Sequence, residues 1–155
     1  MNPYRRLMRR LGRARLLAWL GPRVLTPFDQ LSHGKRIPDT TLGLGLPLVY
    51  LTTKGRRTGL DRTVPLLGIP HDDGGTVVPG TNWGSPHHPA WVHNLRSEAR
   101  ATLELDGASI DVIATPIEGS EYEQYWQRFT AIWPGYDDYR RRAHRTIALY
   151  VLEEQ

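Results

Sequence analysis

The chain has 155 residues, 39% of them hydrophobic, with 15 Gly, 12 Pro and no Cys. This length fits one domain with a buried core, and the lack of Cys excludes disulfides and thiolate metal sites. The net charge of +4 is uneven, because residues 1–28 hold seven Arg and no acid and the rest of the chain therefore carries −3, which argues against a nucleic-acid surface over the body of the protein.

The first predicted element is a basic amphipathic helix over residues 4–20, in which apolar residues recur at helical spacing with Arg between them. It includes Trp19 and ends before Gly21-Pro22. Such a helix can lie on an anionic membrane surface, pack on its own domain with solvated Arg or, less simply, bind RNA. No apolar run approaches the ~20 residues that span a bilayer. Residues 26–45 follow as a predicted linker.

A hairpin is predicted next, with strands at residues 48–53 and 63–69 around the turn Lys54–Arg62. The turn is rich in Arg, Gly and Thr. Glycines let the backbone approach a ligand, and Arg side chains bind phosphate or carboxylate with two hydrogen bonds. The turn lacks the Walker and Rossmann spacings, so composition alone also allows a simple Arg-rich hairpin tip.

After a turn at residues 71–75 and a short strand at residues 76–79, an aromatic loop leads into a predicted helix at residues 89–98. Its three clustered histidines, His87, His88 and His93, lack metal-ligand spacing, so no metal site is expected.

Asp106-Gly107 is a favoured two-residue turn, and it predicts a hairpin between residues 102–105 and 109–114. Ser120 and Glu123 have the spacing of a capping box for a helix that reaches Ile132. A Pro-Gly turn, a short helix and a closing strand at residues 146–152 complete the pattern. The whole predicts an α+β domain around a small barrel of about six antiparallel strands.

The motifs together resemble a known family. Their order is Thr-Thr-x-Gly-Arg-Arg-Thr-Gly-x-x-Arg from Thr52, then Pro65, Asn82-Trp83-Gly84, Pro89-x-Trp91-x-x-Asn94-Leu95, Tyr136-x-x-Tyr139 and Arg145-Thr146. Over residues 48–152 this order resembles the deazaflavin-dependent nitroreductase family, in the split β-barrel group of flavin/deazaflavin oxidoreductases.

The resemblance implies an FMN-binding-like split β-barrel at residues 26–155, preceded by a possible membrane-surface anchor at residues 1–25. The implied cofactor is the deazaflavin coenzyme F420, whose reduced form passes a hydride to quinones, nitroaromatics or other electron-poor lipophilic acceptors. The implied partners are such a small-molecule acceptor and, through residues 4–20, an anionic membrane surface, with no nucleic acid. The expected location is cytoplasmic, at the inner face of the cell membrane, as a monomer or homodimer.

The resemblance also implies site residues. For the anionic end of the cofactor these are Lys54, Arg56, Arg57, Thr58, Gly59 and Arg62. Pro65, Leu66 and Leu67 would pass the ring, Thr81, Asn82 and Trp83 would face the linker, and Trp91 with Asn94 would support that loop. Tyr136 and Tyr139 are the implied catalytic residues, on the substrate side of the ring.

Two positions depart from the family pattern. Asn82 stands where relatives often have Lys, and Trp133 stands where Tyr is common, so activity on nitro compounds does not follow directly. Two other interpretations remain open: a related barrel that binds FMN or haem, or a barrel without enzymatic activity that binds a lipid or fatty acid.

Overall fold

The computed structural model describes residues 47–155. The predicted basic helix at residues 4–20, the predicted linker at residues 26–45 and the expected boundary after residue 25 lie outside the described residues.

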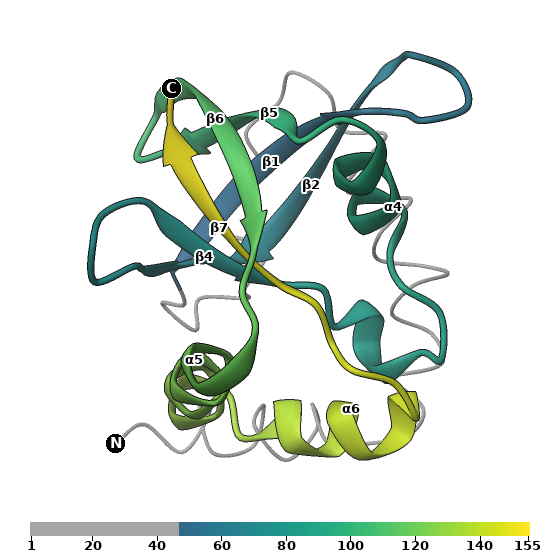
Figure 1. Ribbon diagram of the computed structural model, residues 1–155, viewed down its shortest axis with the longest axis vertical. Coiled ribbons are helices and arrows are strands. Elements are labelled where there is room, and N and C mark those ends of the chain that lie inside the picture. Colours follow the sequence, from purple (N-terminus) through teal and green to yellow (C-terminus); the bar gives the residue numbers. More distant parts are fainter. Residues whose placement is uncertain (1–46) are drawn as a thin grey trace.

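Seven strands form one antiparallel sheet in the order β2-β1-β5-β6-β7-β4-β3. They are β1 (Leu48–Lys54), β2 (Asp61–Leu67), β3 (Ile69–Pro70), β4 (Thr76–Pro79), β5 (Arg100–Leu105), β6 (Ala108–Pro116) and β7 (Leu149–Glu154). The two end strands of this order, β2 and β3, are separated in the chain by Gly68 alone, so the sheet curls into a half-barrel (Figure 1). The predicted antiparallel α+β fold is confirmed, and β3, of only two residues, accounts for the seventh strand.

Gly68 is required where the sheet bends back on itself. A Cβ at this position would lie 2.9 Å from side-chain atoms of both Thr76 and Val49, closer than packed carbon atoms approach. The predicted strand at residues 63–69 is therefore interrupted, because the chain must leave one edge of the sheet here and start the other.

The hairpin between β5 and β6 follows the sequence prediction. Leu105 pairs with Ala108, and the two residues between them, Asp106 and Gly107, have φ values of 51° and 82°. Two consecutive positive φ values define a type I′ turn, which matches the right-handed twist of the strands.

Within residues 47–155, four helical segments accompany the sheet. They are the short 3₁₀ turn η2 (Asn82–Gly84) and the helices α4 (Ala90–Ser97), α5 (Gly119–Ile132) and α6 (Gly135–Ala143). In Figure 1, η2 lies between α4 and α6, and α5 and α6 lie together, away from the β1–β2 and β5–β6 hairpins. Within residues 47–155 no helix has the length and apolarity to cross a membrane.

Two sequence predictions about element ends are wrong. The capping box at Ser120 and Glu123 does not form: α5 starts at Gly119 after Glu118, with no side-chain cap. Ile117, which is buried and donates its N–H to Leu149, fixes the chain just before this point, so Ser120 already lies in the first turn. The closing strand starts at Leu149 instead of residue 146, because the side chain of Arg145 bonds to the loop before α4 and to the carbonyl of Thr146.

The interior divides into two regions. The barrel core fills the inside of the sheet and includes Trp91 of α4, whose ring packs edge-on against Tyr150 at 5.9 Å. The aromatic core joins α5 and α6 to the sheet, and its rings are Tyr122, Tyr125, Trp126, Phe129, Tyr136 and Tyr139. The loop that contains η2 connects the side of the barrel that carries α4 to the aromatic core.

Candidate functional site

The turn between β1 and β2 is closed by its own backbone. Gly55 donates its N–H to Leu60 at 2.8 Å, and Gly59, with φ of 67°, donates to the carbonyl of Gly55 at 2.7 Å. A Cβ at Gly55 would lie 2.8 Å from the hydroxyl of Thr58, whereas nothing lies within 4 Å of one at Gly59. The turn is thus closely packed at Gly55 and accessible to solvent at Gly59. Its residues from Arg56 to Arg62 are exposed.

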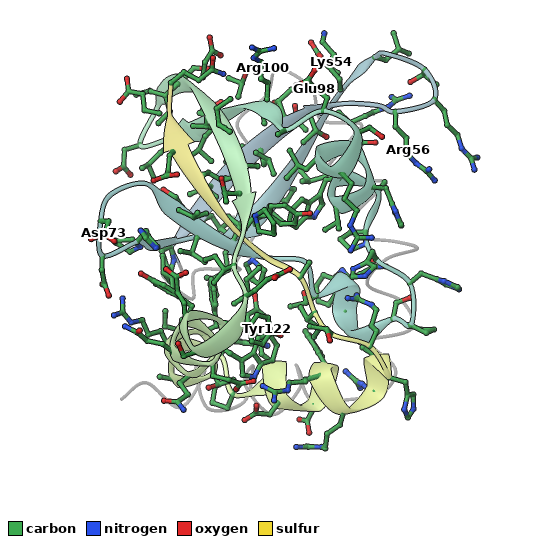
Figure 2. The ribbon with its side chains drawn as sticks, viewed as in Figure 1. Lys54, Arg56, Asp73, Glu98, Arg100 and Tyr122 are labelled. Atoms are coloured by element: carbon green, nitrogen blue, oxygen red, sulfur yellow. The ribbon has the colours of Figure 1, made fainter. Side chains whose placement is uncertain are left out.

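Asn94 fastens this turn to α4. The buried amide of Asn94 accepts the N–H of Arg56 at 3.0 Å and donates to the hydroxyl of Thr53 at 3.0 Å. The structure therefore places Asn94 against the hairpin turn, not against the loop at residues 81–83. Because the amide oxygen of Asn94 binds the backbone of Arg56 and its amide nitrogen binds Thr53, Asn94 fixes the position of the Arg56 backbone. Figure 2 shows that side chain beside α4.

A group of positively charged and imidazole side chains lies next to this turn. We call it the cationic cluster; its members are Arg56, His88, His93, Arg96 and Arg145. Arg145 Nη1 lies 3.1 Å from His88 Nδ1, and Arg96 Nη2 lies 3.4 Å from His88 Nε2. The rings of His88 and His93 meet edge-on with centroids 5.9 Å apart.

The electrostatics of the two histidines reflect this crowding. Burial, followed by the charges of Arg145 and Arg96, lowers the pKa of His88 to about 4. Burial, followed by Arg56, Arg96 and Arg145, also lowers the pKa of His93. A cluster of this kind attracts anions, because several cations lie together and the nearby imidazoles are neutral.

Arg145 also holds the loop that precedes α4. Its guanidinium donates to the carbonyls of Gly80 at 3.1 Å, Thr81 at 3.2 Å, Ser85 at 3.1 Å and His87 at 3.2 Å. The planar guanidinium thus contacts four backbone carbonyls of one loop at once, which the ammonium of a lysine cannot do.

The loop is strained where Arg145 holds it. Asn82, Trp83 and Gly84 have φ values of 45°, 57° and 76°, so three consecutive residues are left-handed and one of them is a bulky Trp. Strain of this kind persists only when surrounding contacts over-determine it, and it concentrates at functional sites. A Cβ at Gly84 would lie 2.9 Å from the backbone of Tyr139, so the loop sits directly on α6.

The aromatic core forms the far side of this loop. The ring of Trp83 lies 6.4 Å from that of Tyr139, which in turn lies 5.7 Å from that of Tyr136. Both phenols are buried, and burial raises the pKa of each. Arg142 lies 5.2 Å from the Tyr139 ring, and its Nε and Nη2 are buried without a hydrogen-bond partner among residues 47–155.

The predicted ring-binding residues lie in β2. Pro65 pairs with Tyr50 of β1 on the outer strand of the sheet, where its missing N–H breaks no ladder. Leu67 is buried in the aromatic core, whereas Leu66 packs against the barrel core. Lys54 is less free than the sequence suggests, because it pairs with Asp61 across the hairpin at 2.7 Å.

Sequence reasoning missed five residues at this site: His88, His93, Arg96, Arg142 and Arg145. His88 and His93 were noticed in the sequence only as possible metal ligands, and Arg145 only as part of the family pattern, so the contacts among them were not visible. Among residues 47–155, no group of three His, Asp or Glu side chains converges on a metal position.

A separate polar pocket of about 440 Å³ lies between the β3–β4 turn and α5. Its groups are paired with their neighbours: His71 with Glu121 at 2.8 Å, and Asp72 with Arg128 at 2.7 Å. Figure 2 shows Asp73, from the lining of this pocket, far from Arg56, so the pocket is distinct from the cationic cluster.

Comparison with known proteins gives one family and several structures. A sequence model of the family described as F420H(2)-dependent quinone reductase matches residues 26–154. A solved structure of an F420-H2 dependent reductase (FDR-A) is 28% identical, with a TM-score of 0.62 over 69% of this chain and 94% of that chain. A second structure, described as a domain-swapped dimer, has the same identity and TM-score and covers 69% of this chain and 80% of that chain.

A protein of unknown function from Agrobacterium tumefaciens str. C58 is 18% identical, with a TM-score of 0.56 over 70% of this chain and 48% of that chain, and this likeness shows the fold alone. Together with the likeness to FDR-A, it confirms the predicted split β-barrel.

Proposed function

Because the chain belongs to the F420H(2)-dependent quinone reductase family, we propose that it passes a hydride from reduced F420 to a quinone or a similar electron-poor, lipophilic acceptor, nitroaromatics included. Family membership makes the chain an F420-dependent reductase. The observation that carries the proposal is the arrangement of the site: a cationic end at the hairpin, a strained aromatic loop, and buried phenols beyond it. A cofactor with an anionic tail and a flat ring fits that order.

The hairpin turn suits the phosphodiester of F420. Arg56, Arg57 and Arg62 are exposed at the turn, and Gly59 leaves the backbone open to close approach. Thr58 adds a hydroxyl, although its oxygen also accepts the N–H of Leu60 at 3.3 Å. Charge-assisted hydrogen bonds from Arg to phosphate are among the strongest polar contacts that proteins make. We assign the phosphate to this turn, with Lys54 contributing less because Asp61 neutralises it.

We assign the ring to the space that β2 and the η2 loop border. Pro65, Leu66 and Leu67 would offer backbone groups and apolar surface along β2, and we assign Thr81, Asn82 and Trp83 of the η2 loop to the linker of the cofactor. Trp91 supports the start of this loop, because its ring would lie 3.6 Å from a Cβ at Gly80. Bound F420 supplies the hydride itself, so the protein must orient the ring and exclude water.

The acceptor side is assigned to Tyr136, Tyr139 and Arg142. Because burial raises the pKa of both phenols, each keeps its proton at neutral pH and can donate a hydrogen bond to an acceptor oxygen. The two unpartnered nitrogens of Arg142 support this placement, since buried donors without acceptors are costly and a quinone oxygen would satisfy them. Tyr139 is the nearer of the two phenols to Trp83 and Arg142.

The N-terminal segment is assigned to the membrane surface. Seven Arg and one Trp among residues 1–28, without any acid, support binding to anionic lipid. Placement at the cytoplasmic face would bring the enzyme to membrane quinones. A homodimer is supported by the 28% identical structure that is described as a domain-swapped dimer.

The test is the oxidation of reduced F420 by purified protein, followed by the return of the oxidised chromophore. We expect turnover with a soluble quinone, and a lower rate for Arg142→Met with F420 affinity unchanged. Arg100→Lys, an exposed change at the start of β5, is the control. Tight F420 binding without oxidation by any quinone or nitroaromatic would overturn the proposed acceptor class.

A further inference from the structure

His88 lies between two guanidinium groups, which only donate hydrogen bonds, whereas a neutral imidazole has one accepting nitrogen. Arg145 is fixed by loop carbonyls and lies closer, 3.1 Å from Nδ1, so Nδ1 is the acceptor. Nε2 therefore carries the hydrogen and faces Arg96 Nη2 at 3.4 Å with no acceptor between them. An anionic oxygen that lies beside this pair, within hydrogen-bond distance of each nitrogen, would accept from both groups.

His93 is the second imidazole of the cationic cluster and lies next to His88. Its ring contacts His88, and the charged groups that face it come from every neighbouring element: Arg56 from the hairpin, Arg96 from α4 and Arg145 from the α6–β7 connection. All of them are cations. A neutral His93 is thus the form favoured without a ligand, and a bound anion would offset these positive charges and favour the protonated form.

We propose that the cationic cluster binds an anionic group of the cofactor, phosphate or tail carboxylate, and takes up one proton at His93 as it does so. The proposal rests on the proposed function for the identity of the ligand, but the anion site itself does not. His88 stays neutral, because Arg145 uses its Nδ1 as an acceptor. The uptake is therefore one proton and not two.

The sign of the pH dependence follows from linkage. The pKa of His93 is lowered in the free protein and is raised by a bound anion, so protonated His93 favours binding. Affinity should rise as pH falls through the window between these two pKa values, by at most ~10-fold per pH unit for one proton. Below the free-protein pKa no further gain is expected.

The first arm of the test uses sulfate, whose charge is constant over this range, and follows the histidine ring resonances by NMR from about pH 4 to pH 8. His88→Gln and His93→Gln assign the signals. We expect saturating sulfate to raise the His93 pKa by about one unit or more, and to leave the ring resonances of exposed His144 in place. An unmoved His93 overturns the proposal.

The second arm uses calorimetry of F420 binding in buffers with different ionisation enthalpies. The deazaflavin chromophore without phosphate and tail corrects for titration of the ring. We expect up to one proton of uptake for the full cofactor beyond that of the chromophore. His93→Gln should abolish it. His144→Asn should not, because this exposed residue has φ of 50°, which Asn tolerates.

The outcomes separate the two proposals. A sulfate-induced rise in the His93 pKa without any F420 binding contradicts the proposed function and supports the anion site. F420 binding without extra proton uptake, or with uptake that survives His93→Gln, overturns the inference and leaves the proposed function intact.

Discussion

Replacing Arg145 tests whether one side chain holds the strained loop in its binding shape. Its guanidinium reaches four loop carbonyls at 3.1–3.2 Å and the ring of His88 at 3.1 Å. Hydrogen bonds to charged groups contribute ~1.5 kcal/mol each at the low end, or ~6 kcal/mol for four. Arg145 is partly exposed, so water can replace about half of this, which leaves ~3 kcal/mol.

Strain acts in the opposite direction. The left-handed Trp83 costs ~1–2 kcal/mol, whereas Asn82 tolerates its φ of 45°, and the strain at Trp83 is released if the loop relaxes. We therefore expect Arg145→Ala to lower the free energy of unfolding by ~1–3 kcal/mol and to weaken F420 binding at least ~10-fold. The stability and the F420 affinity of Arg145→Lys should lie between those of the wild type and of Arg145→Ala, because an ammonium cannot reach several carbonyls at once.

The assays are urea unfolding and F420 titration by fluorescence, on the same preparations. Arg100→Lys serves as the control, because this exposed residue starts β5 and lies apart from α6 (Figure 2). If Arg145→Ala keeps both wild-type stability and wild-type F420 affinity, Arg145 does not hold the loop in its binding shape.

Four further predictions follow from the site and its surroundings. Arg56→Ala with Arg57→Ala should weaken F420 binding at least ~10-fold in the fluorescence titration, since charged hydrogen bonds to phosphate are lost; unchanged affinity contradicts the assignment. Tyr136→Phe should lower turnover more than F420 affinity, and a loss confined to affinity contradicts a role toward the acceptor. Deletion of residues 4–20 should abolish sedimentation with anionic liposomes while F420 binding persists; equal sedimentation rules out the anchor. Arg128 lowers the pKa of Asp72, so this pair stabilises the fold above the unfolded-state value of 3.8 and the effect is lost as pH falls through the lower folded-state pKa. The stability difference between wild type and Asp72→Asn should accordingly shrink between about pH 5 and pH 2 in urea unfolding, and a constant difference refutes it.

Much of the fold was predictable because its signals are local. Asp106-Gly107 specifies a two-residue turn by backbone preference alone, and the end of α5 at Ile132 follows from the Pro-Gly pair after it. The capping box at Ser120 failed because a tertiary contact at Ile117 set the start of the helix. Closure of the sheet at Gly68 was also invisible, since it depends on contacts with two other strands.

At the candidate site, too, features of consecutive residues are visible in the sequence and long-range contacts are not. The Arg-rich turn is visible in the sequence because its residues are consecutive, whereas the hydrogen bond from this turn to Asn94 is not. The hydrogen bonds from Arg145 to the loop join residues about 60 positions apart. The contact of Arg145 with His88 spans a similar separation in the sequence. Such contacts leave no periodic pattern in a single sequence. Family resemblance indicated that Arg145 matters, and only the structure indicates why.

The most direct measurement is a titration of the purified protein with F420 and, in parallel, with FMN, followed by ligand fluorescence. We predict binding of F420 at ~1 µM or tighter, a free energy of about −8 kcal/mol, with no comparable binding of FMN. Preference for FMN, or failure to bind either cofactor, would contradict the account.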